Sequence, residues 1–484
     1  MLFNSFHFLI FFLVITTSYF ALPYNKRWIL LLAASCYFYM AFVPIYILIL
    51  GFTIVIDYFA GIYIEDAIGK QRKLFLIISL IANLGVLSIF KYYNFLNETC
   101  SFLLQGFGLE NPIPYLSILL PIGLSFHTFQ AMSYTIEVYR GRQPAERHFG
   151  IYSLYVMFYP QLVAGPIERP QNLLHQFREK FDFDYNRVTS GLRLMTWGLF
   201  KKVVIADRLA IVVDNVYNNP YEHNSLSLII ATVFFTFQIF CDFSGYSDMA
   251  IGAARIMGFR LMTNFDTPYQ SKTIQEFWKH WHISLSTWFK DYFYIWLGGN
   301  RVTVPRWYLN LFLVFLVSGL WHGASWTFII WGALHGFYLV FGLATKNFRM
   351  KINQFLGIDR FDFLSVLITF CLVAFAWIFF RANGVQTAFY IASHIFTGLP
   401  FLWHKMINHQ SVFENMGLDK YGLILSVLLI IFLESVQFLQ KHKNLSRLFK
   451  TFPTIVRWSL YYGIILTMLF AGVFEKRQFI YFQF

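Results

Sequence analysis

Charged residues are scarce in this sequence. Of its 484 residues, 13% are Asp, Glu, Lys or Arg, whereas 57% are hydrophobic and 21% are aromatic. The mean hydropathy is +0.53. This composition excludes an ordinary soluble domain and indicates a polytopic membrane protein that lies in a lipid bilayer.

Acidic residues are the scarcer charged class, 25 against 38 Lys and Arg, which gives a formal net charge of +13. A basic balance of this kind raises the question of nucleic-acid binding. The basic residues lie between apolar segments, however, rather than in one patch interleaved with aromatic residues. We therefore interpret them as cytoplasmic loops under the positive-inside rule and expect no nucleic-acid partner.

Cysteine is also rare, and motifs for covalent or nucleotide chemistry are missing. The four cysteines are scattered and have neither CxxC nor metal-ligand spacing: Cys36, Cys100, Cys241 and Cys371. No disulfide framework and no metal site is expected from them. No stretch resembles a serine-hydrolase elbow, a Walker loop or a dinucleotide glycine motif.

Apolar segments alternate with short charged loops along the whole chain. Lys26 and Arg27 follow the first segment, which places this loop in the cytoplasm and the amino terminus outside. Ile151–Pro166 is short, broken by proline and flanked by charges that look cytoplasmic, so we expect a re-entrant segment there. At roughly 20 residues per span, we expect about ten to thirteen membrane segments. The apolar segments from which they are drawn are Phe6–Leu22, two in Trp28–Ile64, Leu74–Leu96, Leu116–Tyr139, Ile151–Pro166, Thr189–Val204, Leu226–Phe243, two in Trp307–Thr345, Phe361–Phe380, Val385–Leu399, Tyr421–Leu439 and Trp458–Val473.

The uncharged run Trp307–Thr345 contains two histidines, placed where polar groups are costly. Its length is nearly two spans, and the residues Gly319, Gly323 and Ser325 predict a break around His322. The run therefore reads as a helical hairpin with a histidine near its fold. We find no internal repeat or linker in the chain and expect a single domain over residues 1–484.

A histidine in such a run is either a packed, hydrogen-bonded core residue or part of a substrate or proton path. For His322 the neighbours favour function, because Gly323 permits close approach and Trp321 and Trp326 are placed to hold the ring. His335 lacks that setting, and we favour the packing interpretation for it.

A second group of candidate residues lies between Thr273 and Asn300. Thr273 and Glu276 have capping-box spacing, so a helix should begin there and run to Gly298. Aromatic and aliphatic residues recur at steps of three and four and form one stripe. The stripe fits an amphipathic helix at the membrane interface, whereas His282, which lies on another face, would either face water or point into a cavity.

Two carboxylates, Asp242 and Asp248, stand at the edge of the segment Leu226–Phe243. Each is placed either to orient a histidine or to cap a helix, and capping is the simpler interpretation.

Several longer stretches form a combination that is specific to one family. They are PIGLSFHTFQAMSYTIEVYRG at Pro121–Gly141, YPQLVAGPIER at Tyr159–Arg169, DFSGYSDMAIG at Asp242–Gly252, FWKHWHISLSTWFKDYFYIWLGGNR at Phe277–Arg301, SGLWHGASWTFIIWG at Ser318–Gly332 and the terminal QFIYFQF. Together they resemble the membrane-bound O-acyltransferase family, in particular its bacterial branch that contains the alginate O-acetyltransferase membrane subunit.

The resemblance implies an all-α ring of transmembrane and re-entrant helices around a central tunnel, in a bacterial inner membrane. The family's catalytic histidine falls on His322 and its second motif histidine on His282, with Trp321, Asp242 and Asp248 as supporting candidates. The implied donor is acetyl-CoA from the cytoplasm, transferred directly with His322 as general base and without a metal. The implied partner is a periplasmic or membrane-anchored acetyltransferase that finally modifies a polysaccharide.

Other functions remain open at this stage. A transporter or channel for an intact solute would also have many spans and buried histidines. A scaffold for polysaccharide export would tolerate replacement of both histidines. Within the family, the acceptor is alginate, cellulose, another exopolysaccharide or peptidoglycan, and a D-alanyl group on a carrier protein is the alternative donor.

Overall fold

The computed structural model describes residues 1–484 apart from 118–120, 163–164, 357–361, 401–403, 405–406, 408–414, 443–450, 475–478 and 481–484. Within the described residues every regular element is a helix and there is no strand. Helices satisfy their own backbone hydrogen bonds, which a chain in lipid requires. The all-α polytopic membrane class expected from composition and from the family resemblance is confirmed.

Eight of the described helical segments are long and apolar enough to cross a membrane: Pro44–Asp66, Lys70–Gln105, Ser225–Met257, Val304–His322, Trp326–Ala344, Asp362–Arg381, Lys420–His442 and Thr454–Ala471. The shorter α1 (Phe6–Ala21) is also apolar. The number of membrane segments expected from the sequence is larger, because it includes shorter and re-entrant segments. The central tunnel stays a prediction.

The described chain divides into two compact units, which we call unit 1 (Met1–Trp197 and Tyr246–Thr263) and unit 2 (Gly198–Gly245 and Asn264–Phe484). Neither is one continuous stretch, since α10 (Tyr185–Phe200) and α12 (Ser225–Met257) each contribute residues to both. A single domain over residues 1–484 stays a prediction.

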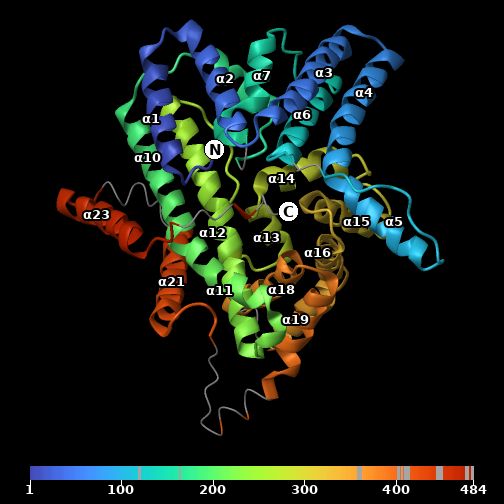
Figure 1. The fold of residues 1–484 in the computed structure, drawn as a ribbon, viewed down its shortest axis with the longest axis vertical. Helices are drawn as coiled ribbons and strands as arrows, with labels where there is room; N and C mark the ends of the chain where they lie inside the picture. The colour runs from blue at the N-terminus through green and yellow to red at the C-terminus, as the bar shows by residue number, and fades with distance from the viewer. Residues whose placement is uncertain are drawn as a thin grey trace. The chain divides into compact units, whose positions relative to one another are not determined.

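Unit 1 begins with α1 and α2 (Tyr24–Met40), which pack against each other, followed by a break at Pro44 as the sequence predicts. The later helices α3, α4 and α6 lie side by side (Figure 1). The elements after α2 are η1 (Pro44–Tyr46), α3 (Ile47–Asp66), α4 (Lys70–Leu87), the π-helix η2 (Ser88–Tyr92), α5 (Tyr93–Gln105), α6 (Leu124–Tyr139), α7 (Phe149–Met157), α8 (Tyr159–Leu162), α9 (Pro170–Leu173) and η3 (Leu174–Arg178).

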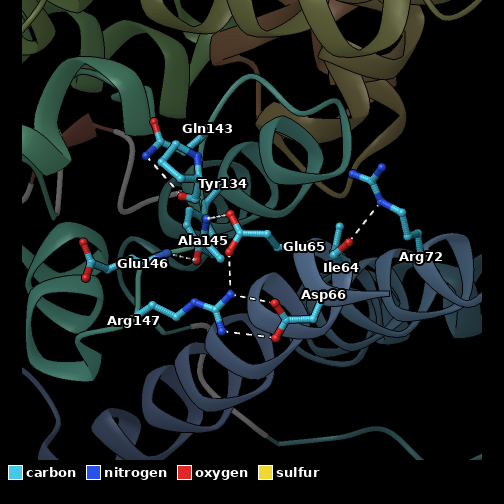
Figure 2. A network of polar contacts seen from close by, with 10 residues as sticks. Ile64, Glu65, Asp66, Arg72, Tyr134, Gln143, Ala145, Glu146 and Arg147 are labelled. Carbon is cyan, nitrogen blue, oxygen red and sulfur yellow. Dashed lines mark hydrogen bonds and ion pairs between the residues drawn. The ribbon is translucent and has the colours of Figure 1, made fainter. Parts of the chain in front are cut away.

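Two polar networks fix α3 in unit 1. In the packed interior, Asp57 of α3 accepts hydrogen bonds from Ser79 (2.6 Å) and Asn83 (2.9 Å) of α4. At the end of α3, Arg147 forms ion pairs with Glu65 (2.6 Å) and Asp66 (2.7 Å), as Figure 2 shows. Buried contacts such as those of Asp57 hold helices together where lipid offers no hydrophobic driving force, whereas the exposed ion pairs of Arg147 tie the loop before α7 to the end of α3.

The segment Ile151–Pro166, predicted to be re-entrant, consists of the short helices α7 and α8, with residues 163–164 outside the described part. Its described side chains are buried. Nothing in the structure tests whether the segment enters the membrane, so this stays a prediction.

Unit 2 is built around a helical hairpin of α15 (Val304–His322) and α16 (Trp326–Ala344), with α18 (Asp362–Arg381) packed on α16. The remaining elements are the π-helix η4 (Lys201–Ala206), α11 (Asp207–Asn218), η5 (Pro220–Glu222), η6 (Pro268–Gln270), α13 (Ile274–His280), α14 (Ile283–Trp288), the π-helix η7 (Phe289–Tyr294), α17 (Lys346–Leu356), α19 (Val385–Thr397), α21 (Lys420–His442) and α23 (Thr454–Ala471).

Two glycines let the backbones of α15 and α16 approach closely. A Cβ on Gly319 would lie 2.3 Å from the carbonyl oxygen of Phe328, and a Cβ on Gly332 would lie 2.3 Å from that of Phe315. Both distances are far inside van der Waals contact with a rigid backbone atom. The hairpin predicted from the sequence is confirmed, and these glycines determine how tightly it packs.

Replacing Gly319 with Ala should therefore separate α15 and α16 and destabilise the protein by about 1–3 kcal/mol, the usual cost of overpacking. Gly463→Ala in α23 is the matched control, because no atom lies within 4 Å of the added methyl group. Thermal unfolding of the purified variants in detergent measures both effects. Equal melting temperatures for Gly319→Ala and the wild type would contradict the close-packing argument.

Candidate active site

His322 is the last residue of α15. Gly323 follows it in extended conformation, and the hydroxyl of Ser325 caps α16 by accepting a hydrogen bond from the amide of Thr327 (3.3 Å). A Cβ on Gly323 would lie 2.2 Å from the Phe328 ring. The break predicted from the glycines and Ser325 is confirmed, and it places His322 at the fold of the hairpin.

His282 lies at a break between two helices. As predicted, Thr273 marks the start of a helix: it caps α13 (Ile274–His280), and its hydroxyl accepts a hydrogen bond from the Glu276 amide (3.1 Å). The prediction of one continuous helix to Gly298 is wrong, because α13 ends at His280 and α14 begins at Ile283. Between them His282 has a φ of 44°, a left-handed conformation that is uncommon for a residue with a side chain.

The cause of this break is a distant segment. Asn264 accepts hydrogen bonds from the Ile283 amide through its carbonyl (2.9 Å) and from the Ser284 hydroxyl through its side chain (2.6 Å). The amide of Asp266 also donates to the carbonyl of His280 (3.0 Å). These bonds replace the helical ones and turn the His282 ring into the interior, where none of it is exposed.

The aromatic stripe of this region is buried in the protein from Phe277 to Tyr292, whereas Ile295 at its end is exposed, and its place at the membrane interface stays a prediction. Phe277, Trp281 and Leu285 are almost completely inaccessible, and Lys279 and Lys290 on the other face are exposed. His282 departs from this pattern because the break rotates it away from the lysines.

The two histidines meet inside unit 2. Their ring centroids are 6.4 Å apart, and His322 is only 4% exposed. Trp321 packs against both, at 5.0 Å from the His322 ring and 6.2 Å from the His282 ring. The structure thus brings together two histidines and the tryptophan that the sequence analysis selected.

Three further aromatic side chains enclose this pair. Phe243 of α12 lies 4.7 Å from the His282 ring, and Trp331 and Phe380 lie 5.1 and 5.5 Å from the His322 ring. Sequence reasoning pointed instead to Trp326, which is half-exposed. We call the enclosure formed by these aromatic rings and Trp321 the histidine pocket.

Burial determines the protonation of His282. It lies between α13 and α14, outside the eight candidate spans, and complete burial lowers its pKa to about 3. Desolvation disfavours the charged imidazolium, so His282 is neutral near pH 7. A neutral imidazole has one N–H donor and one acceptor nitrogen.

Asp242 lies in the interior of α12 and is not a cap, because the helix continues to Met257. The capping interpretation is therefore wrong for both Asp242 and Asp248. The Asp242 carboxylate contacts the Lys202 ammonium group at 2.8 Å, and Lys202 also contacts Asp207 at 2.8 Å. All three side chains are at most 4% exposed.

The same carboxylate holds a segment from far along the chain. Ile480 donates its amide hydrogen to Asp242 (2.8 Å), and the neighbouring Phe479 packs at 5.8 Å from Phe243. Asp242 is therefore linked to the histidine pocket through its neighbour Phe243. Asp248 is half-buried and belongs to the part of α12 in unit 1.

His335 has the packing role expected for it. Its ring is fully buried and accepts a hydrogen bond from the indole of Trp278 (3.2 Å). Trp331 stands between the two histidines of the hairpin, 5.1 Å from His322 and 5.0 Å from His335. Among the described residues, no three His, Cys, Asp or Glu side chains come together as metal ligands.

Sequence reasoning did not select Lys202, Asp207 or Asn264. The sequence does contain an indication of the role of Lys202. A lysine pair interrupts an apolar stretch there, and a buried lysine needs an acidic partner. The sequence contains no such indication for Asn264, because its role depends on a contact with residues that are distant in the sequence.

Comparison with known proteins identifies relatives for most of the chain. Residues 142–380 match the profile of MBOAT, the membrane-bound O-acyltransferase family. A protein of Pseudomonas aeruginosa named "Probable alginate O-acetylase AlgI" is 39% identical over 406 residues, which cover 82% of this chain and 75% of that protein.

More distant comparisons extend the range of named activities. A "Peptidoglycan O-acetyltransferase" of Helicobacter pylori is 37% identical over 398 residues, 75% of this chain and 72% of that protein. A "Teichoic acid D-alanyltransferase" of Bacillus subtilis is 28% identical over 302 residues, 58% of this chain and 70% of that protein.

The buried charges of Lys202, Asp207 and Asp242 give a stability prediction. Lys202→Met would leave two buried carboxylates without their cation and should destabilise the protein by about 3–5 kcal/mol. The triple variant Lys202→Met, Asp207→Asn, Asp242→Asn removes all three charges and should recover part of the loss. Thermal unfolding followed by tryptophan fluorescence tests this, and a Lys202→Met variant as stable as the wild type would contradict it.

Proposed function

This chain belongs to the membrane-bound O-acyltransferase family, and we propose that it takes an acetyl group from cytoplasmic acetyl-CoA across the bacterial inner membrane for O-acetylation of an extracytoplasmic polysaccharide. It is a multi-pass membrane protein and an acyltransferase enzyme. The names of its alginate and peptidoglycan relatives support acetyl as the transferred group and an alginate-like exopolysaccharide or peptidoglycan as the final acceptor.

One observation carries the proposed site. His282 and His322 come from separate helices, yet their rings lie 6.4 Å apart in one buried aromatic pocket. Burying an imidazole costs free energy unless its ring nitrogens find hydrogen-bond partners, so two such rings side by side indicate a role in packing or in chemistry. The His335 ring shows the packing arrangement, with an indole hydrogen bond and close aromatic contacts on several sides.

In this mechanism His322 is the general base. Its ring nitrogen takes the proton of an acceptor hydroxyl as the hydroxyl oxygen attacks the thioester carbonyl carbon. The carbon–sulfur bond then breaks, and the leaving thiolate takes the proton back from the His322 imidazolium. An imidazole suits the first step because its usual pKa is near neutrality.

The position of His322 at the last residue of α15 favours the charge that this step creates. The carboxy-terminal end of a helix carries partial negative charge, which stabilises an imidazolium. The described residues offer no recognisable covalent nucleophile in the pocket, so we favour direct transfer over an acyl-enzyme.

His282 is the proposed electrophilic partner. Being neutral, it has an N–H group that donates to the thioester carbonyl oxygen as negative charge develops there. Trp321 and Phe243 hold the ring from two sides. Asp242 acts further out by fixing Phe243, and we assign no role to Asp248 in this step.

A periplasmic or membrane-anchored acetyltransferase is the proposed recipient of the acetyl group. Such a partner would complete the modification of the polysaccharide. The similarity to a teichoic acid D-alanyltransferase supports one alternative, a D-alanyl group delivered by a carrier protein, at lower identity and over less of the chain. A solute transporter would not require acetyl-CoA.

Replacing His322 with Ala should abolish transfer of radiolabelled acetyl from acetyl-CoA in membranes that contain the partner, since a general base contributes roughly 10²–10⁴ in rate. His442→Ala, at an exposed histidine on α21, is the matched control and should retain activity. Normal labelling in the inserted His322→Ala variant would refute the assignment. Absence of label in the wild type would move the proposal to the D-alanyl donor.

The role of His282 is tested by pairing two substitutions. His282→Ala should lower kcat by about 10²–10³, the usual effect of losing one oxyanion donor. His282→Gln retains an N–H donor and should recover part of that loss. Steady-state acetyl transfer in membranes measures both. Equal kcat values for the two variants would contradict a hydrogen-bond role and favour simple packing.

A further inference from the structure

Unit 1 contains a cavity that the proposed chemistry does not use. It has a volume of about 600 Å³ and lies between the beginning of α10 and the end of α12 with the residues that follow it. That volume is typical of sites for small molecules and cofactors. Six of its lining residues matter here: Arg187, Arg255, Arg260, Ser190, Phe181 and Phe259.

The helices that form the cavity are placed by close packing. A Cβ on Gly191 of α10 would lie 2.8 Å from the carbonyl oxygen of Gly252 in α12, so these helices touch backbone to backbone. After α12, Gly258 has a φ of 113°, and a Cβ there would lie 2.3 Å from the Phe181 ring. The cavity is therefore built on backbone contacts that need glycine at these positions.

Three arginines line this cavity, and its lining residues include no Asp or Glu. Arg255 donates to the Ser190 hydroxyl (3.2 Å), and Arg187 donates to a backbone carbonyl, that of Asp182. The described bonds of Arg260 are made by its backbone, with the side chain of Gln176. No described ion pair involves any of the three, although like charges gathered at one site repel each other.

This arrangement matches one chemical class of ligand. Guanidinium groups bind phosphate through paired N–H donors, and several of them around one cavity suit a ligand with more than one negative charge. Phe181 and Phe259, whose ring centroids are 5.4 Å apart, add an apolar wall. We propose that this cavity binds a phosphate-bearing ligand, either the nucleotide end of a coenzyme A thioester or the headgroup of an anionic phospholipid.

The side of the membrane favours the coenzyme. The positive-inside pattern predicts that the charged residues on both sides of Ile151–Pro166 are cytoplasmic, and the cavity's α10 follows them. Coenzyme A thioesters are available on that side. This choice of ligand rests on the proposed acetyl-CoA donor, whereas phosphate binding by the three arginines does not.

The test compares the double variant Arg255→Gln, Arg260→Gln with Arg306→Gln, an exposed arginine in α15. Free coenzyme A is titrated into the purified full-length protein in detergent. Losing two charge-assisted contacts should weaken binding at least about tenfold in the double variant, and Arg306→Gln should bind as the wild type does. Pantetheine, which lacks phosphate, should bind all three proteins equally.

Native mass spectrometry with added phosphatidylglycerol provides the lipid arm. Loss of bound lipid in the double variant, with coenzyme A binding unchanged, would assign the cavity to a phospholipid headgroup. If neither coenzyme A binding nor lipid retention differs between the double variant and Arg306→Gln, the inference is overturned.

Two further variants distinguish a loss of phosphate binding from a folding defect and from a failure of the proposed function. Arg255→Lys with Arg260→Lys keeps both charges but loses the paired donors, so it should fold and weaken binding by a smaller factor than glutamine. His322→Ala should bind coenzyme A normally while transferring no acetyl group. Arginine-dependent binding by a wild-type protein that transfers no acetyl would sink the proposed donor and leave the cavity assignment standing.

Discussion

The backbone contact between α15 and α16 is the constraint on which the histidine pocket depends. Gly319 and Gly332 allow an approach that no larger residue permits, and α15 ends at His322, three residues after Gly319. Because α16 lies this close, Trp331 reaches the His322 ring, and α18, which packs on α16, brings in Phe380. The position proposed for His322 therefore depends on the absence of side chains at Gly319 and Gly332.

The sequence predicted those parts of the site whose causes are local. Glycine and serine around His322 predicted the hairpin break, and Thr273 with Glu276 predicted the start of α13, because helix ends are encoded by nearby residues. The interruption at His282 was missed, since its cause is Asn264, which removes the helical hydrogen bonds from outside. Periodicity describes a helix that continues, and it contains no information about a distant segment that competes for its backbone.

The buried charges show a related limit. Asp242 at the edge of an apolar segment looked like a helix cap, whereas the structure continues α12 through it and pairs the carboxylate with Lys202. The Asp242 carboxylate can be buried inside a helix because the Lys202 ammonium group and the Ile480 amide both bind it. The family motif marked Asp242 as a residue of interest, but its partners became evident only once residues far apart in the sequence were placed together.

The hydrogen bond from Ile480 to Asp242 also bears on how the protein is assembled. It joins residues 238 positions apart. Closing so long a loop costs conformational entropy, so we expect this contact to form late, after the intervening helices are in place. Lys202, Asp207 and Asp242 belong to neighbouring elements and emerge earlier during synthesis. The ion pairs can thus form first and neutralise one another's charges. Ile480 then binds the Asp242 carboxylate last, as Phe479 packs against Phe243.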